Sequence, residues 1–261
     1  MQNIPLKDRL ERNPDWFDVH GAPQAPTLLL VHGSTLTRQS WKPQVDMLQE
    51  KYRIINPDLP GHGTLADFPF TMAGAIRTLV AAVEMNHVQH MLLVGASLGG
   101  HVATLYASLH PEHTAGLVIS GASMNFHGLV GGWTRLVGKL MPRLFSPTRL
   151  QQTAEQSMRK KWPADIVEGL LKAGLYPAGA FQSFRELPDY DFKTLLQKVQ
   201  APVLILNGEL DRPNRKQEQE FAAAAKQAQI KIIDGAGHAC AIEKPGAFNQ
   251  AVLTFAKQVF N

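Results

Sequence analysis

The stretch MLLVGASLGG, residues 91–100, decides how the rest of this 261-residue chain is interpreted. Its apolar start, residues 91–94, predicts a buried strand, and helical periodicity over residues 98–109 predicts a helix directly after it. Between them lies a G-x-S-x-G sequence. This pattern is typical of a sharp strand-to-helix turn that holds Ser97 with its hydroxyl above the edge of a sheet. The two glycines lack Cβ atoms, so the strand and the helix can approach closely there.

Outward from this turn, short aliphatic runs alternate with helical patterns. We expect strands at 15–20, 27–31, 52–56, 116–120, 203–206 and 230–233, and helices at about 41–50, 72–85, 214–228 and 245–259. Near-continuous apolar runs are typical of strands that are covered on both faces, as in a parallel sheet. The sequence therefore predicts an α/β fold with a mostly parallel, doubly wound sheet.

Residues 122–200 interrupt this alternation. They contain no convincing strand but several helical stretches separated by prolines, which predicts a helical cap inserted into a core made of residues 1–121 and 201–261. The net charge of +4 is unevenly distributed, because residues 122–200 hold 11 Lys and Arg against 6 Asp and Glu. The basic excess lies in one segment and no nucleic-acid motif is present, so we expect no nucleic-acid partner.

The first helix of this insertion is amphipathic. Large apolar residues at i, i+3 and i+4 spacing form one face: Leu129, Val130, Trp133, Leu136, Val137, Leu140, Met141 and Leu144. A second face carries the basic stripe Arg135, Lys139 and Arg143. Such a helix either lies on an anionic membrane or packs its apolar face on its own protein. We expect the second arrangement, which is the default for a surface helix, and therefore no membrane surface as a partner.

Cysteine content and motifs limit the cofactors. Cys240 is the single cysteine, so neither an internal disulfide nor a cysteine-rich zinc site is expected. No HExxH spacing and no nicotinamide or flavin signature occurs, which predicts neither a metal nor a cofactor. The first 16 residues carry charges and lack the apolar centre of a secretory signal, so we expect a cytoplasmic protein.

A serine hydroxyl is a weak nucleophile and needs a general base that is held by an acid. The strand at 203–206 leads into a loop with two acids, Glu209 and Asp211, and both are candidates at this point. The strand at 230–233 leads into a glycine-rich turn that ends at His238. The order serine, acid, histidine is the one expected for this arrangement.

Five motifs carry a resemblance to a known family. They are VHG at 31–33, PDLPGHG at 57–63, GASLGG at 95–100, PVLILNGELD at 202–211 and GAGHACAIEKP at 235–245. Together they resemble the α/β-hydrolase superfamily, in particular its cap-bearing serine hydrolases such as esterases and carbon–carbon bond hydrolases. We expect His32 and His62, which lie in two of these motifs, to hydrogen-bond backbone groups. His101, on the helix after Ser97, could approach the site, but we expect it to pack in the core.

The resemblance implies a role for each matching position. Ser97 would be the nucleophile, His238 the general base and Asp211, rather than Glu209, the orienting acid. The backbone N–H groups of Leu98 and Ser34 would form the oxyanion hole.

The same resemblance implies an activity. A serine at this turn suits attack on an acyl carbon, whereas the related epoxide hydrolases and dehalogenases use an aspartate. We expect hydrolysis of a small or medium carboxylic ester, with a pocket lined by Met124, Phe126 and Trp133. Two alternatives remain: a carbon–carbon bond hydrolase of a diketone acid, whose carboxylate would pair with Arg135 or Arg185, and a small-molecule receptor with little turnover.

Overall fold

The computed structural model describes residues 5–261, and residues 1–4, the start of the stretch in which we expected no secretory signal, lie outside the described part. Seven strands form one sheet in the order β1-β3-β2-β4-β5-β6-β7. β1 pairs antiparallel with β3, and the other neighbours are parallel. The strands are β1 (Phe17–His20), β2 (Thr27–Val31), β3 (Arg53–Pro57), β4 (Met91–Ala96), β5 (Thr114–Ser120), β6 (Val203–Gly208) and β7 (Ala228–Ile233). The predicted mostly parallel sheet is confirmed.

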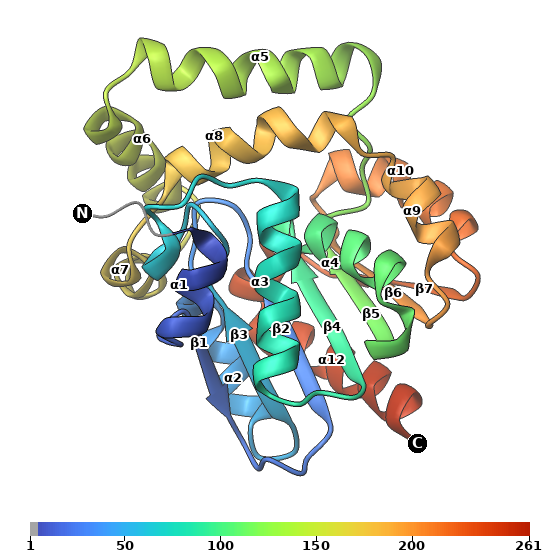
Figure 1. The fold of residues 1–261 in the computed structure, drawn as a ribbon. Coiled ribbons are helices and arrows are strands. Elements are labelled where there is room, and N and C mark those ends of the chain that lie inside the picture. Colours follow the sequence, from blue (N-terminus) through green and yellow to red (C-terminus); the bar gives the residue numbers. More distant parts are fainter. Residues whose placement is uncertain (1–4) are drawn as a thin grey trace.

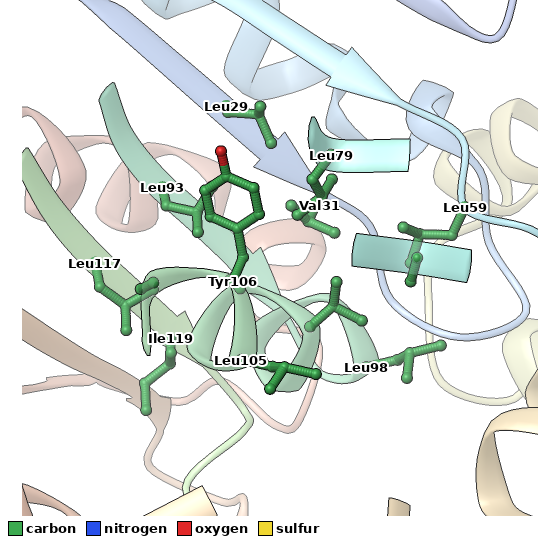
Figure 2. Packing of buried hydrophobic residues seen from close by; sticks show 14 of the residues in the cluster. Leu29, Val31, Leu59, Leu79, Leu93, Leu98, Leu105, Tyr106, Leu117 and Ile119 are labelled. Carbon is green, nitrogen blue, oxygen red and sulfur yellow. The ribbon is translucent and has the colours of Figure 1, made fainter. Parts of the chain in front are cut away.

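Helices cover both faces of the sheet (Figure 1). One face packs against α3 (Met72–Met85), α4 (Leu98–Leu109) and α10 (Arg212–Ala224), and the other against α2 (Lys42–Leu48) and α12 (Pro245–Phe260). Strand residues alternate between the two cores: Leu29 joins the first, which Figure 2 shows around Tyr106, and Leu28 joins the second. This alternation follows from the two-residue period of a strand.

Several short helices complete the core. They are α1 (Leu6–Arg12), α11 (Cys240–Glu243) and the 3-10 turns η1 (Arg38–Trp41), η2 (Gly63–Leu65) and η3 (Pro111–His113). We did not expect α1, because its seven residues are mostly charged and it buries one side chain, Leu10. A single buried position gives no periodic pattern in the sequence.

The chain between β5 and β6 is helical. It contains α5 (Gly128–Leu144), α6 (Pro147–Arg159), α7 (Ala164–Ala173), α8 (Pro177–Glu186), η4 (Leu187–Asp189) and α9 (Phe192–Lys198). Proline at the first turn starts α6 and α8, where its missing N–H costs no hydrogen bond. Figure 1 shows α5 as the outermost helix, lying along α8.

The orientation of α5 corrects our expectation that its apolar face packs inward. The face that meets α8 contains Gly138, where an added Cβ would lie 2.6 Å from the carbonyl oxygen of Phe181. This close backbone approach requires the glycine face inside, so the large apolar side chains point to solvent: Leu129 is 94% exposed and Trp133 is 68% exposed. Among residues 5–261, no helix has the length and apolar character needed to cross a bilayer.

Candidate active site

Ser97 stands at a strained turn between β4 and α4. Its φ of 51° and ψ of −117° lie outside the regions that residues other than glycine usually adopt. A Cβ on Gly95 would lie 2.3 Å from the carbonyl oxygen of Gly99, and one on Gly99 would lie 2.0 Å from that of Val31. The G-x-S-x-G glycines are therefore needed to let α4 begin directly against the strands.

Three side chains from separate loops meet at this turn. His238 Nε2 lies 3.0 Å from Ser97 Oγ, and His238 Nδ1 lies 2.9 Å from Asp211 Oδ2. The loops that carry them follow β4, β6 and β7, whose carboxyl ends share one edge of the sheet. Asp211 is 4% exposed, whereas the side chain of His238 is 53% exposed. A buried carboxylate that holds a more accessible imidazole is suited to moving a proton to and from the serine.

The second acid of the β6 loop points elsewhere. Glu209 is exposed, and its Oε2 accepts a hydrogen bond from the N–H of Gly235 at 2.8 Å. It stabilises the turn that precedes His238, and within residues 5–261 it forms no hydrogen bond with the imidazole itself. Of the two candidate acids, the structure brings Asp211 to His238.

Two further residues hold this arrangement, and our sequence analysis missed both. Asn214 donates to Asp211 Oδ2 at 2.9 Å and is itself buried. Glu243 accepts from the N–H groups of Gly237 and Ala239, the residues on either side of His238. Asn214 lies one helical turn after Asp211 and Glu243 lies within the GAGHACAIEKP motif, so their positions gave a signal that we did not use.

Two buried histidines shape the loop that contains Ser34. His32 Nδ1 donates to the carbonyl of Gly33 at 2.8 Å, and its Nε2 accepts from the N–H of Leu59 at 3.0 Å. Burial lowers the pKa of His32 to about 4 and that of His62 to about 3, so both imidazoles are neutral. A neutral ring offers one donor and one acceptor, which these backbone bonds use. The expected backbone role of His32 and His62 is confirmed.

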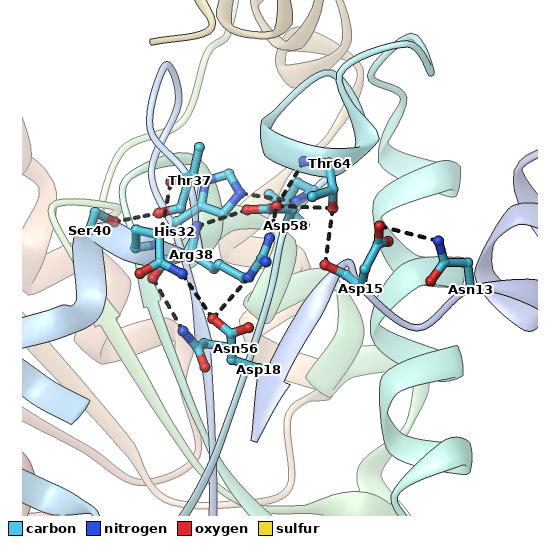
Figure 3. A network of polar contacts seen from close by, with 12 residues as sticks. Asn13, Asp15, Asp18, His32, Thr37, Arg38, Ser40, Asn56, Asp58 and Thr64 are labelled. Atoms are coloured by element: carbon cyan, nitrogen blue, oxygen red, sulfur yellow. Dashed lines mark hydrogen bonds and ion pairs between the residues drawn. The ribbon is translucent and has the colours of Figure 1, made fainter. Parts of the chain in front are cut away.

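A buried ion pair ties this loop to the PDLPGHG loop. Asp58 is fully buried and pairs with the Arg38 guanidinium, while its two oxygens also accept from the backbone N–H groups of Arg38 and Thr64 (Figure 3). Arg38 Nε reaches Asp18 on β1 at 3.0 Å. Asp58 is thus a structural residue that joins the backbones of the two loops.

The backbone N–H groups of Leu98 and Ser34 are available for a ligand. Neither donates a hydrogen bond to another group within residues 5–261. Ser34 and Ser97 line the same two cavities. A Cβ on Gly33, the residue directly before Ser34, would lie 3.6 Å from the Cβ of Ser97. Unused N–H donors beside a serine hydroxyl are the groups that an oxyanion would need.

Two cavities meet at Ser97 and His238. The larger, of about 610 Å³, extends toward α6 and is lined there by Met158, Lys161 and Trp162. The smaller, of about 230 Å³, is mainly apolar and is lined by Met124, Phe126, Phe184 and Leu187 among others. Met124 and Phe126, which we expected in a substrate pocket, line this smaller cavity. Trp133 does not: it is on the outer face of α5 and lines neither of these two cavities.

The cations that we considered for a substrate carboxylate are also elsewhere. Arg135 pairs with Asp189 at 2.6 Å, and neither it nor Arg185 lines the two cavities. Lys161 lines the larger cavity instead, on the segment that follows α6. Arg135 lies away from the cavities because α5 packs its glycine face on α8, which turns Arg135 toward η4 rather than toward Ser97.

His101 both packs in the core and borders the smaller cavity. Its ring lies against Phe192, with centroids 4.2 Å apart, and burial lowers its pKa to about 3. Its Nδ1 has no hydrogen-bond partner within the described chain. The ring therefore presents a neutral polar group at the edge of an apolar cavity.

Cys240 is buried beside Ser120. Burial raises the pKa of the Cys240 thiol to about 11, and its Sγ lies 3.2 Å from Ser120 Oγ. A thiol in this state is not a nucleophile at neutral pH. Across residues 5–261, no group of three or more His, Cys, Asp or Glu side chains is placed to hold a metal ion.

Comparison with known proteins identifies the family of this chain. The family model described as "Alpha/beta hydrolase family" matches residues 28–251. The chain is 26% identical to a pimeloyl-[acyl-carrier protein] methyl ester esterase of Vibrio cholerae over 89% of this chain and 95% of that protein. It is 25% identical to mouse protein ABHD14A over 87% of this chain and 69% of that protein.

Solved structures show the same fold. A thermophilic esterase from Thermogutta terrifontis is similar with a TM-score of 0.80 and 25% identity, over 94% of this chain and 93% of that one. MenH from S. aureus is similar with a TM-score of 0.84 over 95% of this chain and 100% of that one. At 19% identity, the second likeness concerns the fold alone.

Proposed function

Because this chain belongs to the alpha/beta hydrolase family, we propose that it is a serine hydrolase that cleaves a small or medium carboxylic ester through an acyl-enzyme. The observation that carries the proposal is the position of His238, within hydrogen-bond distance of both Ser97 Oγ and Asp211 Oδ2. The two esterases to which the chain is similar support the choice of an ester.

The proposed mechanism follows from the contacts. His238 Nε2 takes the proton of Ser97 as Oγ attacks the acyl carbon, and the negative charge on the former carbonyl oxygen is stabilised by the N–H groups of Leu98 and Ser34. The imidazolium, held by Asp211, then gives its proton to the leaving alcohol. Water, activated in turn by His238, attacks the acyl-enzyme and releases the acid, which restores Ser97.

The two cavities suit the two parts of an ester. Both reach Ser97, so the scissile bond would lie where they meet, with one substituent in each. The smaller cavity, of about 230 Å³ with mainly apolar walls, suits a short hydrocarbon group. The larger accepts a longer and more polar group near Lys161. In this proposal residues 122–200 form a cap, since α6 and α8 contribute walls to these cavities.

The test is covalent labelling with a fluorophosphonate probe. Wild-type protein should be labelled and Ser97→Ala should not. Ser157→Ala is the matched control, because this serine lines the larger cavity without contacting His238, and it should be labelled like the wild type. Equal labelling of Ser97→Ala and wild type would refute the assigned nucleophile.

A series of p-nitrophenyl esters of increasing acyl length then tests the substrate class. We expect turnover that falls once the acyl group exceeds the cavity that holds it. Lys161 is a cation that a carboxylate-bearing diketone could contact, which keeps the carbon–carbon bond hydrolase as a second candidate. Labelling without ester turnover would favour that candidate or a receptor with little turnover.

A further inference from the structure

The outer face of α5 carries a continuous apolar row. We call Leu129, Trp133, Leu136, Leu140 and Leu144 the α5 stripe. Their spacing of three and four residues places them on one side of the helix, and they are between 39% and 94% exposed. Isolated exposed hydrophobic residues are ordinary, but a contiguous row of large ones marks an interaction site.

The fold forces this face outward. Gly131 and Gly138 are the buried residues of α5, and both have backbone atoms of other residues within 3 Å of where a Cβ would stand. Turning the helix to bury the stripe would place large side chains where only glycine fits. The exposed stripe is therefore a consequence of how α5 packs on α8, and burying it within this chain would require separating the two helices.

Cations border the stripe on one side. Lys139 and Arg143 are exposed, lie one turn apart beside Leu136 and Leu140, and form no ion pair within residues 5–261. Arg135, which continues the basic row, is already paired with Asp189. The sequence of α5 contains no Asp or Glu. A partner of this face must accept apolar side chains and also offer negative charge.

A second copy of the chain fits this surface poorly. The helix has 17 residues, so at 1.5 Å per residue and about 10 Å in width its outer face covers roughly 250 Å². A stable protein interface buries about 800 Å² on each partner. Two copies related by a two-fold axis would also bring their Lys139 and Arg143 groups toward one another.

We propose that the α5 stripe docks this protein onto an anionic lipid surface. The helix would lie parallel to the surface, with Trp133 and the leucines among the upper acyl chains and with Lys139 and Arg143 near the phosphates. Lysine and arginine stems are long enough to keep their charges at the headgroups while lying along apolar side chains. A lipid surface sets no minimum contact area, because its affinity grows with both the apolar area and the charge.

The experiment is co-sedimentation of the full chain with vesicles, comparing phosphatidylcholine alone with phosphatidylcholine that contains phosphatidylserine. The wild type should bind the anionic vesicles more strongly. Leu136→Glu combined with Leu140→Glu should lower the bound fraction at least about tenfold. Lys139→Gln combined with Arg143→Gln should lower binding to anionic vesicles about 10- to 30-fold. Met47→Glu combined with Leu109→Glu, which changes exposed apolar residues outside α5, is the matched control and should bind like the wild type.

Circular dichroism and labelling of Ser97 report whether each variant is folded, and neither should change, since the substituted side chains face solvent. Absence of wild-type binding, equal binding to neutral vesicles, or full binding by the Leu136 and Leu140 variant would each overturn the proposal. A wild-type dimer in light scattering that this variant converts to a monomer, without lipid binding, would assign the stripe to a second copy instead.

Discussion

Replacement of Asp211 by asparagine tests how the proposed proton relay is held. Asp211 Oδ2 lies 2.9 Å from His238 Nδ1, which places the two charge centres roughly 4 Å apart when the imidazole is protonated. At an effective dielectric constant of about 20, such a pair interacts by about 4 kcal/mol, which corresponds to roughly 10³-fold in rate. Because the imidazole is half-exposed, solvent screens part of this energy. Loss of the charge alone should therefore lower kcat/KM by about 10²- to 10³-fold.

The asparagine also affects the proton on the imidazole. If its NH₂ group turns toward His238, Nδ1 must accept and Nε2 can no longer take the serine proton, a change worth about 10⁴-fold in the serine protease where it was measured. However, Asn214 donates to the same carboxylate oxygen, and this bond favours an oxygen at that position in the variant. We therefore expect the smaller loss.

The assay is kcat/KM for a short p-nitrophenyl ester, with Glu209→Gln as the matched control. Glu209 is two residues away and carries the same charge, but it contacts Gly235 rather than His238, so its variant should keep activity within about twofold. Asp211 does not have this role if Asp211→Asn keeps more than a tenth of the activity, or if Glu209→Gln loses as much as Asp211→Asn.

Three other predictions concern stability and the position of His238. Burial lowers the pKa of His101 from 6.5 to about 3. Between these two pH values the unfolded chain binds a proton at this residue that the native state excludes. The free energy of unfolding should therefore fall by up to about 1.4 kcal/mol per pH unit from this group as the pH drops toward 4. Urea unfolding of wild type and His101→Phe should show the smaller slope in the variant. Gly99→Ala places a Cβ 2.0 Å from a backbone oxygen and should destabilise the fold by about 3 kcal/mol or more. Gly169→Ala, with open space around the new Cβ, should stabilise α7 by about 0.5–1 kcal/mol. Thermal unfolding that ranks the two variants the other way would contradict this packing. Glu243→Gln leaves one oxygen for the two N–H groups beside His238 and should slow fluorophosphonate labelling about tenfold, and an unchanged labelling rate would show that this clamp does not position the imidazole.

The sheet, the Ser97 turn and the order of the loops that meet there could be predicted from local patterns in the chain. Strand and helix periods are local properties, and the strands expected from apolar runs match the seven that form. The turn could also be predicted, because the φ of Ser97 and the close contact between Gly95 and Gly99 are requirements of a short segment. Parallel strands have their carboxyl ends at the same edge of the sheet. Residues that the sequence places directly after such strands are therefore brought together there.

Which side chains contact one another depended on how distant segments pack together. The two acids of the β6 loop are alike in chemistry, and only the family resemblance favoured Asp211 over Glu209. The course of the loop places Asp211 at His238 and Glu209 at Gly235. The α5 helix shows the same limit. Burying its large apolar side chains would be favourable, which is why we expected that face inside. The face that lies against α8 is instead the one with Gly138, where an added Cβ would lie 2.6 Å from the carbonyl oxygen of Phe181. How closely two distant segments can approach depends on the shapes of their surfaces, and a periodic sequence pattern carries no information about those shapes. In α5 the close packing on α8 outweighs the tendency of leucine and tryptophan to avoid water.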